Sequence, residues 1–102
     1  MGGMELSIFA RFHAHPGQAA AVEAALRAVV GPSRAEPGCA FIEAYRSTQD
    51  ANRFHIHSRW VDEAAFEHHA ALPHTVRFLA TVEPLVDHPL EVSRARPLDL
   101  AG

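Results

Sequence analysis

Two histidines that could move protons stand five residues apart in this sequence, at His69 and His74. Imidazole is the side chain that titrates closest to neutral pH, so either residue is a candidate general base. Trp60 ends an alternating stretch, and Phe66 precedes His69 by three residues. That spacing places Phe66 and His69 on one face of a helix, whereas His68 is rotated by about 100°. We therefore expect His69 to face a pocket and His68 to face solvent.

The alternation from Arg53 to Val61 predicts a strand with two unlike faces. Ser58 and Trp60 lie on the more apolar face, which we expect to pack beneath the helices. The following helix should then cover Trp60, and His74 should begin the next helix near the same space. The sequence thus predicts that an indole, a phenyl ring and two imidazoles surround one cavity between sheet and helices.

Other interpretations of the same residues stay open. A tryptophan and a phenylalanine under a helix are often ordinary core residues. His69 could instead stabilise a helix C-terminus, and His74 could hydrogen-bond a carbonyl group. His55 and His57 share a strand face, but the chain has no cysteine cluster and no closely spaced carboxylates, so we predict no metal site. Neither a GxGxxG nor a GxSxG motif occurs, and we expect no cofactor and no hydrolase chemistry.

The bounds of the helices and strands that position these residues can be predicted from hydrophobic periodicity and from the positions of proline and glycine. Gly31-Pro32 should stop or kink the first helix, Asp62 should cap the second, and Leu72-Pro73 should separate the second from the third. Pro89 places the last strand at a sheet edge. Strands are predicted at 5–13, 41–47, 53–61 and 85–93, and helices at 18–30, 62–70 and 73–82. The order β-α-β-β-α-β, with its second helical region split, predicts a ferredoxin-like α+β fold with an antiparallel sheet.

Length and charge narrow the function further. The 102 residues suit a single domain, 1–102, with a core at about 5–93 and a loose or partner-bound tail at 94–102. A net charge of −3 without a basic run disfavours nucleic acid, and no apolar run is long enough to span a membrane. The lone Cys39 and the lack of a signal peptide favour a cytoplasmic protein. Phe9, His55 and His57 on the second sheet face predict a homodimer.

Several of these motifs together resemble the antibiotic biosynthesis monooxygenase (ABM) superfamily of dimeric α+β barrel proteins. The resemblance extends from Ile8 to about Val92 and rests on the run Glu36-Pro37-Gly38-Cys39, on Arg53-Phe54, on the stretch from Trp60 to Phe66, on His69 and on Pro73-His74. It implies a sheet-to-sheet dimer forming a barrel. Superfamily members include quinol monooxygenases, haem-degrading enzymes and the autoinducer-2 degrading isomerase.

Departures from the family patterns disfavour some of these activities. Ser58 stands where members commonly have glutamate, and Ala10 stands where the haem-degrading branch has asparagine. Ile56 and Phe66 replace the polar pair of the polyketide-oxidising members. The isomerase has a similar Pro-His element, but its phosphorylated substrate would require basic groups that the helix-facing positions lack.

The resemblance therefore implies a cofactor-independent monooxygenase that oxidises a small aromatic quinol or phenol with molecular oxygen. It implies His74 as the base and His69 as a residue that orients the substrate or shares the proton. Trp60, Phe66 and Phe12 would hold the ring, and Ser58 would offer a hydroxyl. The alternatives are an isomerase or lyase similar to the autoinducer-2 degrading enzyme, and a dimeric protein that binds a small molecule without turnover.

Overall fold

A computed structural model describes residues 5–98 and 100 of the chain. The predicted order of elements is confirmed, with a short 3₁₀ turn added before the last strand. The strands are β1 (Leu6–His13), β2 (Cys39–Arg46), β3 (Arg53–Trp60) and β4 (Glu91–Ala95); the helices are α1 (Ala19–Arg34), α2 (Glu63–Ala71) and α3 (Pro73–Val82), and the 3₁₀ turn η2 is Glu83–Leu85.

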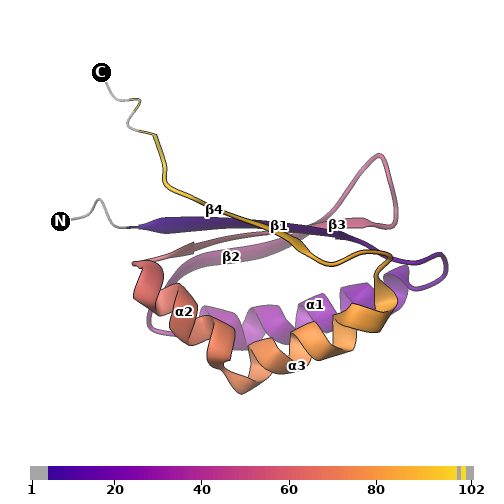
Figure 1. Ribbon diagram of the computed structural model, residues 1–102, viewed down its shortest axis with the longest axis horizontal. Coiled ribbons are helices and arrows are strands. Elements are labelled where there is room, and N and C mark those ends of the chain that lie inside the picture. Colours follow the sequence, from indigo (N-terminus) through magenta and orange to yellow (C-terminus); the bar gives the residue numbers. More distant parts are fainter. Residues whose placement is uncertain (1–4, 99, 101–102) are drawn as a thin grey trace.

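The four strands form one antiparallel sheet in the order β2-β3-β1-β4. All three helices lie against one face of this sheet, so the molecule has two layers (Figure 1). This arrangement is the ferredoxin-like α+β fold predicted from the sequence. Among residues 5–98 and 100, no helix has the length and apolar character needed to cross a bilayer.

The core lies between the two layers, as strand alternation predicts. Phe12 on β1 and Phe54 on β3 are fully buried against Val22 of α1 and Phe78 of α3 in the larger core cluster. Trp60 forms a smaller cluster beneath α2, with β1 residues beside it. The register of β1 against β3 pairs Phe12 with Phe54 and Leu6 with Trp60, which places both pairs on the helix-covered face.

α1 is longer than predicted, because it continues through Gly31-Pro32 to Arg34. A proline in the last turn removes a single backbone hydrogen bond, and other contacts hold this end of the helix. Ser33 Oγ donates to the Val29 carbonyl oxygen at 2.7 Å, and the Arg34 guanidinium donates to the Ile42 carbonyl oxygen at 3.1 Å. The expected stop at residue 30 is therefore wrong.

The last strand begins later than predicted. Leu85 belongs to the 3₁₀ turn, Val86 forms only an isolated bridge to Ala14, and Pro89 precedes the strand. β4 does lie at a sheet edge, as predicted. Its residues Arg94 and Ala95 fall in the segment expected to be a loose tail. Arg94 and Ala95 are instead part of the sheet, because β4 pairs with β1. The tail positions 99 and 101–102 lie outside the described residues.

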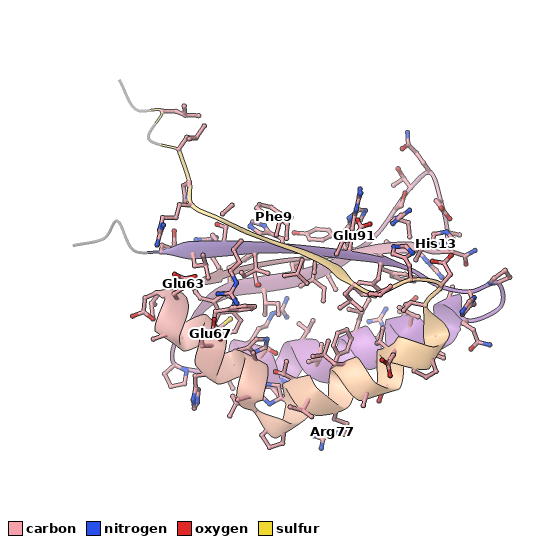
Figure 2. The ribbon with its side chains drawn as sticks, viewed as in Figure 1. Phe9, His13, Glu63, Glu67, Arg77 and Glu91 are labelled. Carbon is pink, nitrogen blue, oxygen red and sulfur yellow. The ribbon has the colours of Figure 1, made fainter. Side chains whose placement is uncertain are left out.

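None of the helices in the described part of the chain lies on the second face of the sheet (Figure 1). Phe9 and His57 stack there with ring centroids 4.6 Å apart, and Phe41 packs edge-on against His57 at 5.2 Å. Figure 2 shows Phe9 on the side of the sheet opposite the helices, whereas Arg77 points away from the outer side of α3. The aromatic residues that predict a second subunit thus occupy this uncovered face.

Candidate active site

The break between α2 and α3 brings the two histidines together. The Asp62 side chain caps α2 by accepting from the Ala65 backbone N–H at 2.8 Å. Leu72 leaves the helical conformation with ψ of 150°, as a residue before proline tends to do, and Pro73 starts α3. His69 in the last turn of α2 and His74 in the first turn of α3 therefore face one another, with ring centroids 6.0 Å apart.

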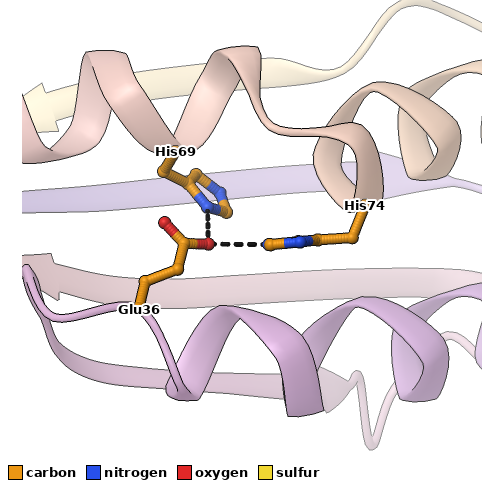
Figure 3. Close-up of side chains that lie close together, drawn as sticks. All are labelled: Glu36, His69 and His74. Atoms are coloured by element: carbon orange, nitrogen blue, oxygen red, sulfur yellow. Dashed lines mark hydrogen bonds and ion pairs between the residues drawn. The ribbon is translucent and has the colours of Figure 1, made fainter.

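Both histidines bind the same carboxylate oxygen, which belongs to Glu36. Glu36 Oε2 lies 2.8 Å from His69 Nδ1 and 2.7 Å from His74 Nε2 (Figure 3). Glu36 follows α1, and its backbone N–H donates to the Ser33 carbonyl oxygen at 3.1 Å. Its side chain is only 7% exposed. The structure thus contains a buried Glu36–His69–His74 triad.

The triad constrains which ring nitrogens carry hydrogen. An ionised carboxylate only accepts hydrogen bonds, so His69 Nδ1 and His74 Nε2 must both be donors. In neutral His69 the remaining nitrogen, Nε2, is then an acceptor with a free lone pair. Thr75 Oγ1, 3.3 Å from His69 Nδ1, adds a second contact on the same side of the ring. Glu36 therefore holds His69 in the tautomer that a general base requires at Nε2.

Aromatic rings support the other side of His69. The Trp60 ring lies 4.4 Å from the His69 ring, centroid to centroid, and the Phe66 ring lies 5.9 Å from it. Trp60 is fully buried, and its indole N–H donates to Ser58 Oγ at 3.0 Å. The prediction that Trp60, Phe66 and His69 converge beneath α2 is confirmed, and His68 is exposed as expected.

A cavity of about 150 Å³ lies beside this cluster, between the sheet and α1, α2 and α3. Its polar lining residues are Ser33, Ser58, His69 and Thr75, and every other lining residue is apolar. Two apolar residues at its rim, Leu79 on α3 and Val92 on β4, are exposed. The cavity therefore reaches the surface between α3 and the edge strand.

The predicted site residues take different places around this cavity. His69, Phe66 and Ser58 line it, and Trp60 supports His69 from behind. His74 does not line the cavity; it contacts Glu36 instead. Phe12 does not line it either, and reaches it only through Phe78, whose ring lies 6.3 Å away edge-on.

Sequence reasoning missed Glu36. It recognised the residue within the Glu36-Pro37-Gly38 turn, but a glutamate in a turn is normally solvated. The signal that could have found it is the need of two buried imidazoles for a shared acceptor. Cys39, close by in sequence, has its pKa raised by burial, so its thiol is a poor nucleophile.

The triad also has the composition of a set of metal ligands. One nitrogen of each histidine and a Glu36 oxygen lie within 4.8 Å of one another. Within the described part of the chain, this is the one group of three or more histidine, cysteine or acidic residues with such spacing.

Comparison with known proteins agrees with the fold and the sequence motifs. The family described as Antibiotic biosynthesis monooxygenase matches residues 6–81. A Mycobacterium tuberculosis protein named "Putative monooxygenase Rv0793" is 32% identical over 97 residues, which cover 95% of each chain. Its solved structure superposes with a TM-score of 0.89, covering 96% of this chain and 99% of that one at 31% identity.

A second solved structure, PA3566 from Pseudomonas aeruginosa, is 34% identical and also has a TM-score of 0.89. The similarity covers 96% of this chain and 98% of the Pseudomonas chain. The family match contains all three triad residues and extends over most of the fold, from the first strand into the last turn of α3. The chain belongs to the antibiotic biosynthesis monooxygenase family.

Proposed function

We propose that this protein is a cofactor-independent monooxygenase that oxidises a phenol or quinol with a single aromatic ring. The observation that carries the proposal is the position of His69. It lines an apolar cavity while its Nδ1 is held by the buried carboxylate of Glu36. Membership of a monooxygenase family supports the same class of reaction.

His69 acts as the base in this proposal. Its Nε2 takes the proton of a phenolic hydroxyl, and the imidazolium that forms is stabilised by Glu36. His74 holds Glu36 from the other side and shares its charge, which makes His74 a positioning residue. The sequence assigned the base to His74; the cavity lining favours His69, because a base must reach the substrate proton.

The deprotonated ring then supplies the electrons for oxygen. One oxygen atom bonds to a ring carbon, the O–O bond breaks, and the second atom leaves as water. The ring loses one C–H hydrogen and its phenolic hydrogen and becomes a quinone, so phenol and oxygen yield quinone and water in balance. A cavity lined mainly by apolar residues excludes bulk water from this step.

The cavity size sets the substrate class. A dry apolar cavity of about 150 Å³ accommodates benzene, and the cavity here has the same volume. One substituted ring matches this space, whereas a fused tricyclic substrate exceeds it. Ser58 Oγ accepts from Trp60 and keeps its own hydrogen, which is available to a second oxygen on the substrate.

Oxygen uptake with a panel of ring sizes tests the proposal. Hydroquinone, a substituted catechol, a naphthol and an anthrone-type tricycle are each added to the purified protein, and quinone formation is followed by absorbance. We expect uptake of one O₂ per quinone with single-ring substrates and little with the tricycle. Ligand binding without oxygen uptake across the panel would mean that the protein is a binding module.

We also propose that the active protein is a homodimer joined through the uncovered sheet face. Phe9 remains 49% exposed there and Tyr45 45% exposed, although both are large aromatic residues. Phe9 and Tyr45, together with His55 and His57, line a shallow depression on this face. A second copy covering this face would remove these rings from water.

A further inference from the structure

We propose that Glu36, His69 and His74 form a binding site for a divalent transition metal of the zinc class, and that the metal competes with the base function of His69. Two imidazole nitrogens and one carboxylate are a common ligand set for zinc sites that keep an open position. Such a site differs from the prediction, based on the spacing of residues in the sequence, that this chain binds no metal. The metal site itself does not require the proposed oxidation, whereas the competition rests on the proposed role of His69 as the base.

The distances are close to those of a metal site. Around a tetrahedral zinc with bonds of about 2.0–2.1 Å, neighbouring ligand atoms lie roughly 3.3 Å apart. His69 Nδ1 and His74 Nε2 lie 2.8 and 2.7 Å from Glu36 Oε2. Each of these two distances must lengthen by about half an ångström to reach that separation, and the two histidine nitrogens lie within 4.8 Å of each other.

The second oxygen of Glu36 is an independent observation. Glu36 Oε1 is buried and finds no hydrogen-bond partner among the described residues, although the same carboxylate accepts two bonds through Oε2. A buried charged oxygen without a partner is costly. A metal ion, which can be shared by both carboxylate oxygens, satisfies it.

The site also has a path for entry. The His74 side chain is 17% exposed and the His69 side chain 11% exposed, so the triad is close to the surface at the helix break.

Metal binding reverses the tautomers of both histidines. The two nitrogens that now donate to Glu36 must offer lone pairs to the metal, so each ring moves its hydrogen to its other nitrogen. His69 Nε2 then becomes a donor and can no longer accept a proton from a substrate. Occupation of the site by metal and catalysis by His69 therefore exclude each other.

Metal binding is measured on the whole protein after treatment with EDTA and removal of the chelator. Titration with Zn²⁺ by calorimetry should give one equivalent per chain, and Co²⁺ should produce visible bands typical of four-coordinate cobalt. Glu36→Gln and His74→Ala should each weaken binding by about 100-fold or more, since losing even an outer-shell partner costs 10–100-fold. His68→Ala, on the exposed side of α2, should bind as the wild type does.

A second control tests another place where a histidine lies next to carboxylates. His13 forms ion pairs with Asp50 and Asp87, and His13→Gln tests whether zinc binds there instead. Loss of binding in His13→Gln with retention in Glu36→Gln would overturn the proposal, as would the absence of stoichiometric uptake in the wild type.

NMR on the wild type keeps the test independent of whether the variants fold. Long-range ¹H–¹⁵N spectra should show His69 and His74 changing tautomer when zinc is added, whereas the tautomer of His68 stays unchanged. Unchanged tautomers at His69 and His74 would overturn the proposal. If the chain oxidises phenols, zinc should inhibit uptake of oxygen and EDTA should restore it. Absence of oxidation would overturn the proposed function and leave the binding result standing.

Discussion

One carboxylate, that of Glu36, accepts hydrogen bonds from two imidazoles. Glu36 is buried, and its two histidine partners come from different helices. Because the carboxylate accepts and cannot donate, it determines the tautomer of both rings. Two neighbouring histidines on α2 thus differ in their surroundings, since His69 belongs to the triad and lines the cavity whereas His68 is exposed to solvent.

Alanine substitutions at His69 and at His68 should therefore have different effects on turnover. His69→Ala should reduce turnover of an accepted phenol by about 10²-fold or more, the scale for losing a general base. His68→Ala should change neither turnover nor stability beyond about 0.5 kcal/mol, as for other surface substitutions. Steady-state oxygen uptake and urea unfolding measure both. Equal activity of the two variants would remove His69 from the mechanism.

At the scale of elements, the turn before β2 must approach α2 closely for Glu36 to reach both histidines. Gly38 lies in this turn, and its carbonyl oxygen accepts from the Val61 N–H at 2.9 Å. A Cβ atom placed on Gly38 would lie 2.5 Å from the Cβ of Ala65. The contact leaves no room for a side chain between the turn and the first turns of α2.

Gly38→Ala should therefore destabilise the protein by about 1–3 kcal/mol, the usual cost of overpacking. Gly31→Ala is the matched control, because its Cβ would meet nothing within 4 Å apart from its neighbours in the chain and the backbone of its own helix. Alanine favours a helix over glycine by about 0.5–1 kcal/mol, but Pro32 disfavours a Cβ on the helical residue before it, so the control should gain no more than this. Chemical denaturation followed by circular dichroism measures both. A Gly38→Ala variant as stable as the wild type would show that the turn and α2 can separate.

A second contact between elements lies at the far end of the sheet. His13 at the end of β1 bonds Asp87 through Nδ1 at 2.7 Å and Asp50 through Nε2 at 3.0 Å. It joins the β2–β3 loop to the segment before β4. The hydrogen bond to Asp87, followed by that to Asp50, raises the pKa of His13, and desolvation partly opposes the rise.

The raised pKa of His13 predicts how stability depends on pH. Because its pKa is higher in the folded state than in the unfolded chain, this group stabilises fully below about pH 6.5. The stabilisation is lost as pH rises through the folded pKa. The difference in Tm between wild type and His13→Gln should therefore be larger at pH 6 than at pH 9. A difference that grows toward alkaline pH would contradict the ion-pair role of His13.

For the molecule as a whole, the two faces of the sheet are unequal. One is covered by three helices, and the other presents Phe9 stacked on His57 (Figures 1 and 2). A chain of 102 residues buries a modest fraction of its surface by itself, and association would extend its core.

The wild type should be a dimer by light scattering at micromolar concentration, and Phe9→Asp should shift it toward monomer. Aspartate at this position would place a charge in the proposed interface, where it lacks a partner. Arg77→Asp on the outer side of α3 also introduces an aspartate and should remain dimeric. A monomeric wild type, or equal behaviour of the two variants, would reject the sheet face as the interface.

Local patterns in the sequence were sufficient to predict most of the helices and strands and which of their faces are buried. Strand alternation placed Phe54, Ser58 and Trp60 on the buried face, and helical spacing separated His69 from His68, because both depend on backbone geometry over a few residues. Pro73 marked the helix break for the same reason. These local features alone predict that the indole of Trp60 and the imidazole of His69 lie close together.

Tertiary contacts decided what local patterns could not. α1 passes through Pro32 because Ser33 and Arg34 find partners there, and β4 starts at Glu91 because its register against β1 sets the pairing. Glu36 became part of the site because packing removed a turn residue from water and placed it between two helices. Long-range burial of a polar side chain leaves no periodic trace in a sequence, so the partner of the two histidines was visible only in the folded molecule.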